Sequence, residues 1–497
     1  MPSTITNNAP VTNQIDPVDH YIAGRWQSSP DRFATTNPLD DSVVAHIAAG
    51  GPDEARAAVD AAAQAFPAWA SMLPVERQRL FLHAADLVEA RTEQIVRILA
   101  VEAGTSTAFA KFQIAWSANL LRQAAGWGYL PYGDLLPSDT PGRFAMAMRK
   151  PLGVVAGFTP WNGAFNLAWR TIVLPLAFGN TVLIKPSEEA PISAGLLHAQ
   201  ILHDAGFPAG VVNVVTHAPG QAAPLADVFF ESPAVRCINF TGSATTARML
   251  AAKAGAALKP IVLELGGYNP LVILDDADLD QAVDATVFGA FFHQGQICMN
   301  TRKVYIDAQL HDEYLVRLAA KTDALVRGNP LDPEVIIGPL INDRAVTQME
   351  TRIQDAVDKG ARVISGNQRD QRVFAPTVLA DVPPTAVATI GQEETFGPLL
   401  VVEAVDSVEQ AVSRAQAVPY GLSAAIVTGD EERGLDLARR FDAGIVHVNS
   451  STMAGEPALP NGGVKDSGWG RSGHYAIEDF TEIRLVTTTH GPAKYPF

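Results

Sequence analysis

The stretch from residue 153 to residue 265 decides the fold, because short β-branched runs alternate along it with helical segments. The runs are GVVAGF (153–158), TVLIK (181–185), GVVNVV (210–215), VRCINF (235–240) and IVLEL (261–265). Amphipathic segments such as APISAGLLHAQILHDAG (190–206) separate them. This alternation predicts a parallel, doubly wound α/β sheet. Ligands on such sheets bind beyond the carboxyl ends of the strands.

The segments on either side extend the α/β pattern. Before the stretch, residues 53–66 and 75–104 carry Ala, Leu and Arg at helical spacing, and Gly104 ends the second segment. After it, residues 275–295 predict a helix that starts among Asp side chains. Three further runs predict strands: RKVYI (302–306), LLVVEAV (399–405) and IVHVN (445–449).

The composition indicates a globular protein and excludes several kinds of partner. With 497 residues, 47% of them hydrophobic, two or three domains with large cores are expected. A net charge of −16 repels nucleic-acid phosphates and anionic lipid, so neither partner is expected. The first fifteen residues lack the basic and apolar regions of a signal peptide and are expected to form a polar arm. Having only Cys237 and Cys298 argues against disulfides or a metal site and indicates the cytoplasm.

Cys298 is the first candidate for chemistry, because it lies in FFHQGQICMNTRK (291–303), just past a predicted helix. A buried cysteine usually behaves as a small hydrophobe, and that interpretation stays open for Cys298 taken alone. A nucleophile needs a thiol pKa below the free value, or a nearby base. Glu264 is a candidate base, because it ends IVLEL among apolar neighbours that are expected to raise its pKa. A capping or salt-bridged role for Glu264 is the alternative.

Other polar side chains also follow predicted strands. Asn162 comes after GVVAGF, where its amide can donate to a developing oxyanion. Lys185 and Glu188 come at the end of TVLIK and face the place that a nucleotide ribose would occupy. Each side chain alone is as compatible with a structural role as with a functional one. Their joint occurrence beyond strand ends favours a catalytic site at that edge.

These segments resemble the aldehyde dehydrogenase superfamily over nearly the whole chain, from YIAGRW at residue 21 to the end. The order and spacing of the shared motifs are those of the family. The motifs are PWN (160–162), KPSE (185–188), FTGS (240–243), ELGG (264–267), GQIC (295–298), EETFGP (393–398) and GGVKDSGWGR (462–471).

The resemblance implies an α/β fold in three parts. A Rossmann-like cofactor domain would comprise residues 1–133 and 149–264, and an α/β catalytic domain residues 265–466. A small β oligomerisation element with the C-terminal tail would comprise residues 134–148 and 467–497. The strand-like tail is suited to joining a neighbouring subunit's sheet, and a homodimer or homotetramer is expected.

The resemblance also implies the catalytic roles. Cys298 would attack the aldehyde to give a thiohemiacetal, with its oxyanion held by Asn162 and the Cys298 N–H. After hydride transfer, Glu264 would activate the water that hydrolyses the thioester, so one difficult step becomes two.

A second set of residues is implied for the cofactor. Lys185 and Glu188 match the pair that holds the adenosine ribose, and Glu394 and Phe396 match residues of the nicotinamide side. Ser243 starts the helix whose N-terminus would face the pyrophosphate. The other implied cofactor residues are Thr159, Pro160, Trp161, Ser187, Gly242 and Leu265. Because a carboxylate at position 188 accepts ribose hydroxyls and repels a 2′-phosphate, NAD is expected rather than NADP.

Within the superfamily, the chain is similar to the bacterial salicylaldehyde, vanillin and benzaldehyde dehydrogenases. The similarity lies in PWNGAFNLAWR (160–170), INFTGS (238–243), EDFTEIR (478–484) and the closing YPF, together with the segment around Cys298. It implies an aromatic aldehyde as substrate. The implied substrate-binding residues are Gly163, Leu167, Arg170, Ile297, Met299 and Asn461.

Four of the positions near the site qualify this expectation. Gly163 is expected to leave room for a flat ring. Arg170 either meets a polar group of the substrate or forms a structural ion pair. Ala247 stands where the family has a glycine, and Asn461 stands where a Phe commonly lines the substrate tunnel.

Three other functions share parts of this evidence. An aliphatic semialdehyde dehydrogenase would use Arg170 to bind the distal carboxylate. A CoA-acylating enzyme generally lacks the Glu of ELGG, and a silent structural or binding relative usually loses the nucleophile or the base. Because Cys298 and Glu264 are both present, the sequence favours NAD-dependent oxidation of an aromatic aldehyde to its acid.

Overall fold

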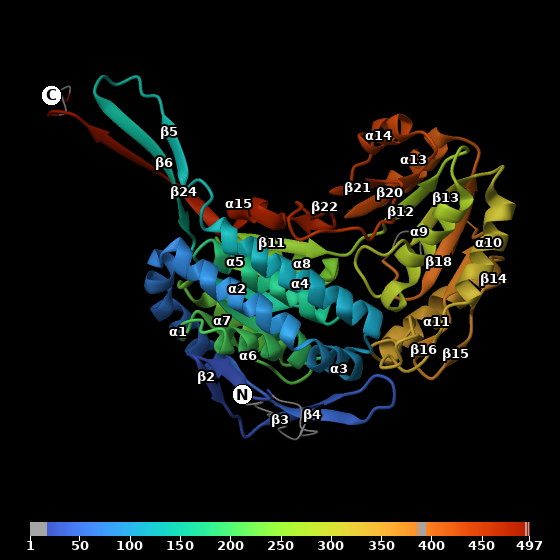
Figure 1. Ribbon diagram of the computed structural model, residues 1–497, viewed down its shortest axis with the longest axis horizontal. Helices are drawn as coiled ribbons and strands as arrows, with labels where there is room; N and C mark the ends of the chain where they lie inside the picture. The colour runs from blue at the N-terminus through green and yellow to red at the C-terminus, as the bar shows by residue number, and fades with distance from the viewer. Residues whose placement is uncertain (1–16, 384, 387–393, 493–494, 496) are drawn as a thin grey trace, which may run out of the picture.

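The computed structural model describes residues 17–383, 385–386, 394–492, 495 and 497, arranged as Figure 1 shows. The polar arm predicted for the first fifteen residues and Glu393 of the EETFGP motif lie outside the described residues.

The predicted doubly wound sheet is present in the N-terminal half. Its eight strands follow the order β2 (Arg25–Gln27), β1 (His20–Ile22), β9 (Val212–Val214), β8 (Thr181–Pro186), β7 (Val154–Thr159), β10 (Val235–Gly242), β11 (Ile261–Leu265) and β23 (Gly468–Trp469). The strands from β9 to β11 are parallel, as predicted, whereas β1, β2 and β23 add to the edges by antiparallel pairing. The carboxyl ends of β8, β7, β10 and β11 therefore lie along one edge.

Helices cover both faces of this sheet, because alternate strand residues such as Val154 and Val155 point into opposite cores. One face packs on α2 (Pro74–Ala90), α3 (Thr92–Ala103), α4 (Thr107–Trp127), α5 (Ala164–Ala177) and α6 (Leu197–Asp204). The other packs on α1 (Pro52–Ser71), α7 (Ala222–Glu231) and α8 (Ala244–Ala256). The helical segment predicted over 75–104 is two helices, α2 and α3, and Gly104 ends the second with a φ of +63°.

The predicted helix over 190–206 begins with a π-helical turn, η1 (Ile192–Leu196), before α6. Glu102, at the end of α3, is fully buried and accepts hydrogen bonds from the backbone N–H groups of Ile192 (2.9 Å) and Ser193 (2.7 Å). One carboxyl group thus satisfies donors that the start of a helix leaves without intrahelical partners.

A second sheet lies in the C-terminal half. Its order is β14 (Arg362–Ser365), β17 (Thr377–Ala380), β18 (Leu399–Val405), β13 (Lys303–Asp307), β12 (Pro270–Ile273), β20 (Ser423–Val427) and β21 (Ile445–Val448). Only β14 is antiparallel to its neighbour. One face packs on α9 (Leu279–Phe291) and α10 (His311–Asp323), and the other on α11 (Asp343–Asp358), α13 (Val408–Gln416) and α14 (Glu431–Ala438).

A three-stranded antiparallel arm projects from the molecule (Figure 1). It consists of β24 (Thr481–Thr489), β6 (Arg143–Pro151) and β5 (Gly133–Leu136), in that order. The C-terminal strand thus pairs along its length with β6 of its own chain. Among the described residues, the outer edges of β24 and β5 pair with no strand. No helix in the described part of the chain is both long and apolar enough to cross a membrane.

Candidate active site

The predicted catalytic residues converge on one cavity at the carboxyl edge of the first sheet. Glu264 is the last residue but one of β11, and Asn162 lies between β7 and α5. Cys298 follows α9 and the short 3-10 turn η2 (Phe292–Gly295). All three line a cavity whose space, open mouth included, is about 750 Å³. All six predicted substrate residues also line it: Gly163, Leu167, Arg170, Ile297, Met299 and Asn461.

The loop that carries Cys298 is bent by residues in left-handed conformations. His293 and Gly295 have φ angles of +53° and +68°, and such a conformation at a residue other than glycine costs energy. Arg302 holds the loop by donating from Nη1 to the carbonyl of Gly295 (2.7 Å) and from Nη2 to that of Ile297 (2.8 Å). The buried guanidinium therefore fixes the backbone immediately before the nucleophile.

The Cys298 thiol is not activated by a lowered pKa. Burial above all, with the nearby carboxyl groups of Glu394 and Glu264, raises its pKa to about 11, against the opposing charges of Arg170 and Arg302. A nucleophilic cysteine needs a lowered thiol pKa or a nearby base, and the first of these conditions is not met in this structure. The second is met, because the carboxyl group of Glu264 lines the same cavity.

Glu264 has the environment of a general base that works near neutral pH. The residue is 8% exposed, and burial raises its pKa to about 7, while Arg170 lowers it. Arg170 places Nη1 3.4 Å from Glu264 Oε2 and donates from Nη2 to Thr241 Oγ1 (3.1 Å). Arg170 therefore lies in an ion pair with a carboxylate, and the same guanidinium also lines the cavity.

Three aromatic residues of α4 that the sequence analysis missed form one wall. Phe109, Phe112 and Trp116 line the cavity, and the Phe109 ring packs 5.2 Å from Phe292 and 4.5 Å from His293. Their spacing of three and seven residues places them on one side of the helix, a signal that was present in the sequence. The remaining lining residues that were missed are Asn166, Leu422, Ile445, Met453, Gly455, Gly462 and Ser472.

Gly163 and Asn461 both line the cavity, and the contacts of each limit what it offers to a substrate. A Cβ atom at position 163 would lie 2.7 Å from Asn166 Oδ1 and 3.0 Å from Leu167, so a larger residue would displace both. The Asn461 amide donates to the carbonyl of Glu456 (2.9 Å), which ties it to its own loop. Its polar group therefore belongs partly to the loop rather than wholly to the substrate space.

Lys185 and Glu188 are joined by a third residue, His217, that the sequence analysis missed. Lys185 is 7% exposed, and its Nζ lies 2.6 Å from His217 Nε2, which lies 3.7 Å from Glu188 Oε2. His217 Nδ1 is 2.9 Å from the carbonyl of Ala218, so Nδ1 carries the proton and Nε2 accepts from Lys185. Burial lowers the pKa of Lys185 to about 8. His217 follows β9 just as Lys185 ends β8, so the strand-end rule would have found it.

Ser243 caps α8, with its side chain accepting from the backbone N–H of Thr246 (3.3 Å). The N–H groups that start this helix form a place for anionic groups such as a pyrophosphate. Ala247 is 1% exposed in the core beneath α8, where its small side chain packs closely. Thr159 donates its hydroxyl to the carbonyl of Ala194 (2.7 Å), so it orders the backbone at this edge.

On the other side of this edge, Glu394 lies against the glycine pair of ELGG. A Cβ atom at Gly266 would lie only 2.0 Å from Glu394 Oε2, so any larger residue here would displace the Glu394 carboxyl group. Burial raises the pKa of Glu394 to about 7, and its Oε1 is buried without a partner among the described residues. The ring of Phe396 packs edge-on against Trp161 at 5.5 Å.

The remaining predicted cofactor residues also lie at this edge, at or just beyond strand ends: Pro160, Ser187, Gly242 and Leu265. This edge fits a dinucleotide, because it offers the N-terminus of α8, the pair of Lys185 and Glu188, and the unpartnered Oε1 of Glu394. Among the described residues, no group of three or more His, Cys, Asp or Glu side chains is placed to hold a metal ion.

Comparisons with known proteins agree with this geometry. Residues 26–486 match the model of the aldehyde dehydrogenase family. The chain is 44% identical to vanillin dehydrogenase of Pseudomonas fluorescens, over 95% of this chain and 98% of that protein. It is 34% identical to the NAD(+) benzaldehyde dehydrogenase of Pseudomonas putida, over 93% and 94%. The crystal structure of a salicylaldehyde dehydrogenase from Pseudomonas putida G7, complexed with salicylaldehyde, superposes with a TM-score of 0.94 at 37% identity, covering 97% of this chain and 99% of that one.

The chain therefore belongs to the aldehyde dehydrogenase family, and it is an enzyme that oxidises aldehydes. The predicted family and the predicted fold are both confirmed. The family uses NAD or NADP, since matched proteins are named for either cofactor.

Proposed function

We propose that this aldehyde dehydrogenase oxidises aromatic aldehydes of the benzaldehyde, salicylaldehyde and vanillin type to carboxylic acids, with NAD as oxidant. The observation that carries the proposal is the cavity wall beside Cys298, which three aromatic side chains of α4 form. Flat apolar walls favour a flat apolar ligand. Relatives named for all three aromatic aldehydes support this choice.

The first chemical step follows from the protonation states. Because the pKa of Cys298 is raised to about 11, the thiol enters the reaction protonated, and Glu264 must take its proton as sulfur attacks the carbonyl carbon. The carbonyl oxygen then becomes an alkoxide, which the Asn162 amide and the Cys298 N–H stabilise as donors. The product is a thiohemiacetal on Cys298.

The second stage forms and breaks a thioester. The hydride of the former aldehyde carbon would leave for bound NAD, which would supply the two-electron oxidant, and that carbon would become a thioester on Cys298. Glu264 would release to solvent the proton it took from the thiol, and would then take a proton from water while the water oxygen attacks this carbon. The carbon–sulfur bond breaks, the carboxylic acid leaves and the thiol regains its proton.

The residues at the adenosine end favour NAD. Lys185 and His217 form one side of this site, and the Glu188 carboxylate, 32% exposed in its side chain, lies 3.7 Å from His217. A carboxylate here accepts hydroxyl groups and repels a 2′-phosphate. We expect kcat/KM with NAD to exceed that with NADP at saturating aldehyde.

A substrate comparison tests the proposal against the semialdehyde alternative. The kcat/KM values for benzaldehyde, salicylaldehyde and vanillin would be measured beside that for succinic semialdehyde. We expect the aromatic aldehydes to be preferred, because Arg170 is engaged by Glu264 and Thr241 rather than free for a distal carboxylate. A preference of about tenfold or more for succinic semialdehyde, which is about 1.4 kcal/mol, would show that the aromatic assignment is wrong.

The enzyme is also proposed to act as a homodimer or homotetramer. The projecting arm supports this, because large apolar side chains lie exposed on both of its faces: Ile483 (62%) and Leu485 (65%) on one, Leu135 (71%) and Met148 (42%) on the other. Exposed apolar area of this kind, next to unpaired strand edges, is typical of subunit contacts.

A further inference from the structure

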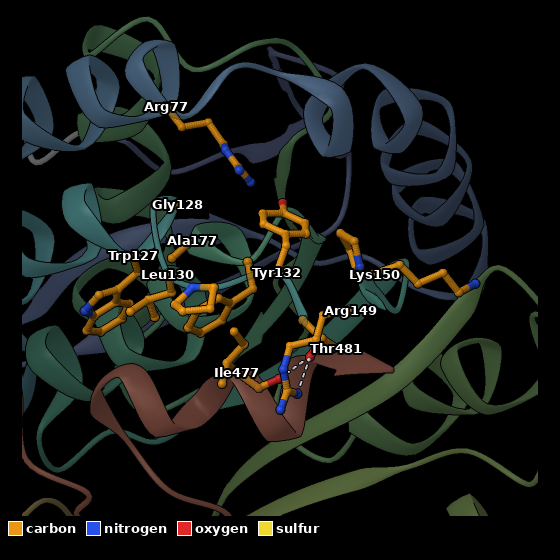
Figure 2. A pocket seen from close by; sticks show the side chains of 13 residues that line it. Arg77, Trp127, Gly128, Leu130, Tyr132, Arg149, Lys150, Ala177, Ile477 and Thr481 are labelled. Atoms are coloured by element: carbon orange, nitrogen blue, oxygen red, sulfur yellow. Dashed lines mark hydrogen bonds between the residues drawn. The ribbon is translucent and has the colours of Figure 1, made fainter. Parts of the chain in front are cut away.

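Two arginines in the described part of the chain are almost wholly buried, Arg77 at 3% and Arg302 at 2% exposure. Arg77 lies at the base of the arm, where Figure 2 shows it extending from α2 toward the ring of Tyr132. Neither its Nε nor its Nη1 has an acceptor among the described residues. Arg302 differs in this respect, because its guanidinium holds backbone next to the nucleophile.

Arg302 donates to two carbonyls of the loop that carries Cys298. Nη1 donates to the carbonyl of Gly295 (2.7 Å) and Nη2 to that of Ile297 (2.8 Å). The backbone carbonyl of Arg302, directly before β13, accepts from the N–H of Val401 in β18 (3.1 Å). Arg302 is thus anchored in the second sheet, and its side chain ties that sheet to the loop.

The Ile297 carbonyl and the Cys298 N–H belong to one peptide unit. Because a trans peptide is planar, its C=O and N–H point in opposite directions. The carbonyl is directed at Arg302 and at the backbone N–H of Asn300 (3.1 Å). The Cys298 N–H therefore points away from Arg302, and it donates to no acceptor among the described residues. Since Cys298 lines the catalytic cavity, this donor is available to a ligand there.

The carbonyl of Cys298 itself is held as well. Asn269, 1% exposed, donates from Nδ2 to the carbonyls of Cys298 (2.7 Å) and Asn300 (2.9 Å). Side chains therefore fix the peptide units on both sides of the Cys298 Cα atom, and the Cys298 N–H has little freedom to turn.

The charge of Arg302 also strengthens this donor. Burial lowers the pKa of Arg302 to about 10, so the guanidinium stays charged at neutral pH. A cation on a carbonyl oxygen forms a stronger hydrogen bond than a neutral donor and polarises the peptide, which makes the N–H of the same peptide a stronger donor. An oxygen that gains negative charge during a reaction benefits most from such a donor.

We propose that Arg302 is a positioning residue of the oxyanion site, because it holds the Ile297 carbonyl so that the Cys298 N–H is aimed at the oxygen of the attacked carbonyl group. This inference rests on the proposed function, in which Cys298 attacks a carbonyl carbon. Arg302 does not line the catalytic cavity and acts through this one peptide unit.

Two probes that need neither NAD nor an aldehyde test this role. The ester 4-nitrophenyl acetate acylates the thiol: sulfur attacks the ester carbon, the carbonyl oxygen becomes an alkoxide, and 4-nitrophenolate then leaves. Iodoacetamide alkylates the same thiol by displacing iodide, and no carbonyl oxygen gains charge. The ratio of the two rate constants at Cys298 therefore reports the oxyanion site, because changes in the reactivity of the thiol affect both.

Arg302→Met is expected to lower the ratio of acylation to alkylation at least about tenfold, since loss of one oxyanion donor costs about 10²–10³-fold in rate. Arg302→Lys, which keeps the charge but not the fork of donors, should lower it less. Arg77→Met is the matched control, because it removes a similarly buried guanidinium at a cavity that shares no residue with the catalytic one, and it should leave the ratio unchanged. An unchanged ratio in Arg302→Met would overturn the inference. This result is independent of the substrate comparison that tests the proposed function.

A crystal structure of the acetylated wild-type enzyme keeps the test independent of how well the variants fold. At about pH 5 the acetyl group should persist, because Glu264, with a pKa of about 7, is protonated and cannot activate water. The thioester oxygen is expected about 2.7–3.2 Å from the Cys298 nitrogen, with the Ile297 carbonyl still on Arg302. A thioester oxygen more than about 3.5 Å from that nitrogen would show that the inference is wrong.

Discussion

In the proposed mechanism, both halves of the reaction depend on Glu264, which would take a proton first from the thiol and later from water. A pKa of about 7 means that half of the molecules carry the base form at neutral pH. The same burial that raises its pKa removes competing water, which strengthens its interaction with Arg170.

Replacing Glu264 by Gln is expected to slow both stages, because an amide can accept neither the thiol proton nor the proton of the attacking water. Steady-state kcat should fall by about 10²–10⁴-fold, the range for loss of a general base. Stopped-flow absorbance would record NADH formation in the first turnover, which should be slower than in wild type, and mass spectrometry of the quenched enzyme would detect any acyl group that persists. Cys298→Ala is the control and should form neither NADH nor the acyl group. Wild-type turnover by Glu264→Gln would contradict the deacylation role.

Arg170 is expected to set the pH at which the enzyme becomes active. Its charge lowers the pKa of Glu264, so Arg170→Met should raise that pKa. Because the base form is the active one, kcat/KM should rise with pH through about 7 in the wild type and at higher pH in the variant. The shift should be up to about one pH unit, or about 1.4 kcal/mol. Arg170→Lys, which keeps the charge, should shift less, and an unmoved acidic limb in Arg170→Met would exclude the pairing as the cause.

At the scale of single residues, the functional side chains that could be predicted from the sequence are those that follow strands within recognisable motifs. Cys298, Glu264 and Asn162 were predicted to act together, and the structure places all three in one cavity. The raised pKa of Cys298 was not predictable, because it depends on how deeply the loop is buried by distant segments. His217 and the aromatic residues of α4 were missed, since neither carries a motif of its own.

At the scale of elements, the π-helical turn η1 depends on the buried carboxyl group of Glu102. Burial raises its pKa to about 7, so the folded state favours the protonated form. The stability that this proton contributes is present below about pH 4.5 and is lost as the pH rises through about 7. Above about pH 7, where Glu102 is ionised in the folded state, its buried charge therefore opposes folding.

Glu102→Gln keeps one acceptor for the N–H groups of Ile192 and Ser193 and removes the titration. Relative to wild type, the variant is expected to become more stable as the pH rises from 5 to 8. Differential scanning calorimetry at both pH values would give the change in the Tm difference. Glu102→Ala, which removes every acceptor, should lower Tm at both pH values. The expected loss in free energy of unfolding is about 1–3 kcal/mol for each unsatisfied group. A Tm difference between wild type and Glu102→Gln that is the same at pH 5 and pH 8 would refute the buried titration.

The elements themselves followed well from the sequence, because period and composition are local properties. The parallel strands from β9 to β11 match the five β-branched runs. The antiparallel edges were not predicted, since β1, β2 and β23 are only two or three residues long, and β1 and β23 join the sheet through strands far along the chain. Pairing of that kind depends on tertiary contacts rather than on propensity.

At the scale of the whole molecule, the sequence indicated a separate β element but not that β24 would pair with β6 of its own chain. This pairing gives the arm three strands and leaves one face of β24 carrying Ile483 and Leu485.

The double variant Ile483→Glu with Leu485→Glu is expected to separate the subunits. Both side chains are exposed in the single chain, at 62% and 65%, so placing charge there costs the fold of one chain little. In an assembly the same charges would be buried without partners, which costs several kcal/mol each. Light scattering behind size-exclusion chromatography should therefore report mass nearer the 52.9 kDa of one chain for the variant than for wild type. Val316→Glu is the matched control, because Val316 is 72% exposed on α10, far from the arm, and should leave the mass unchanged. If the double variant kept the wild-type mass while wild type proved oligomeric, the contact would have to lie elsewhere on the surface.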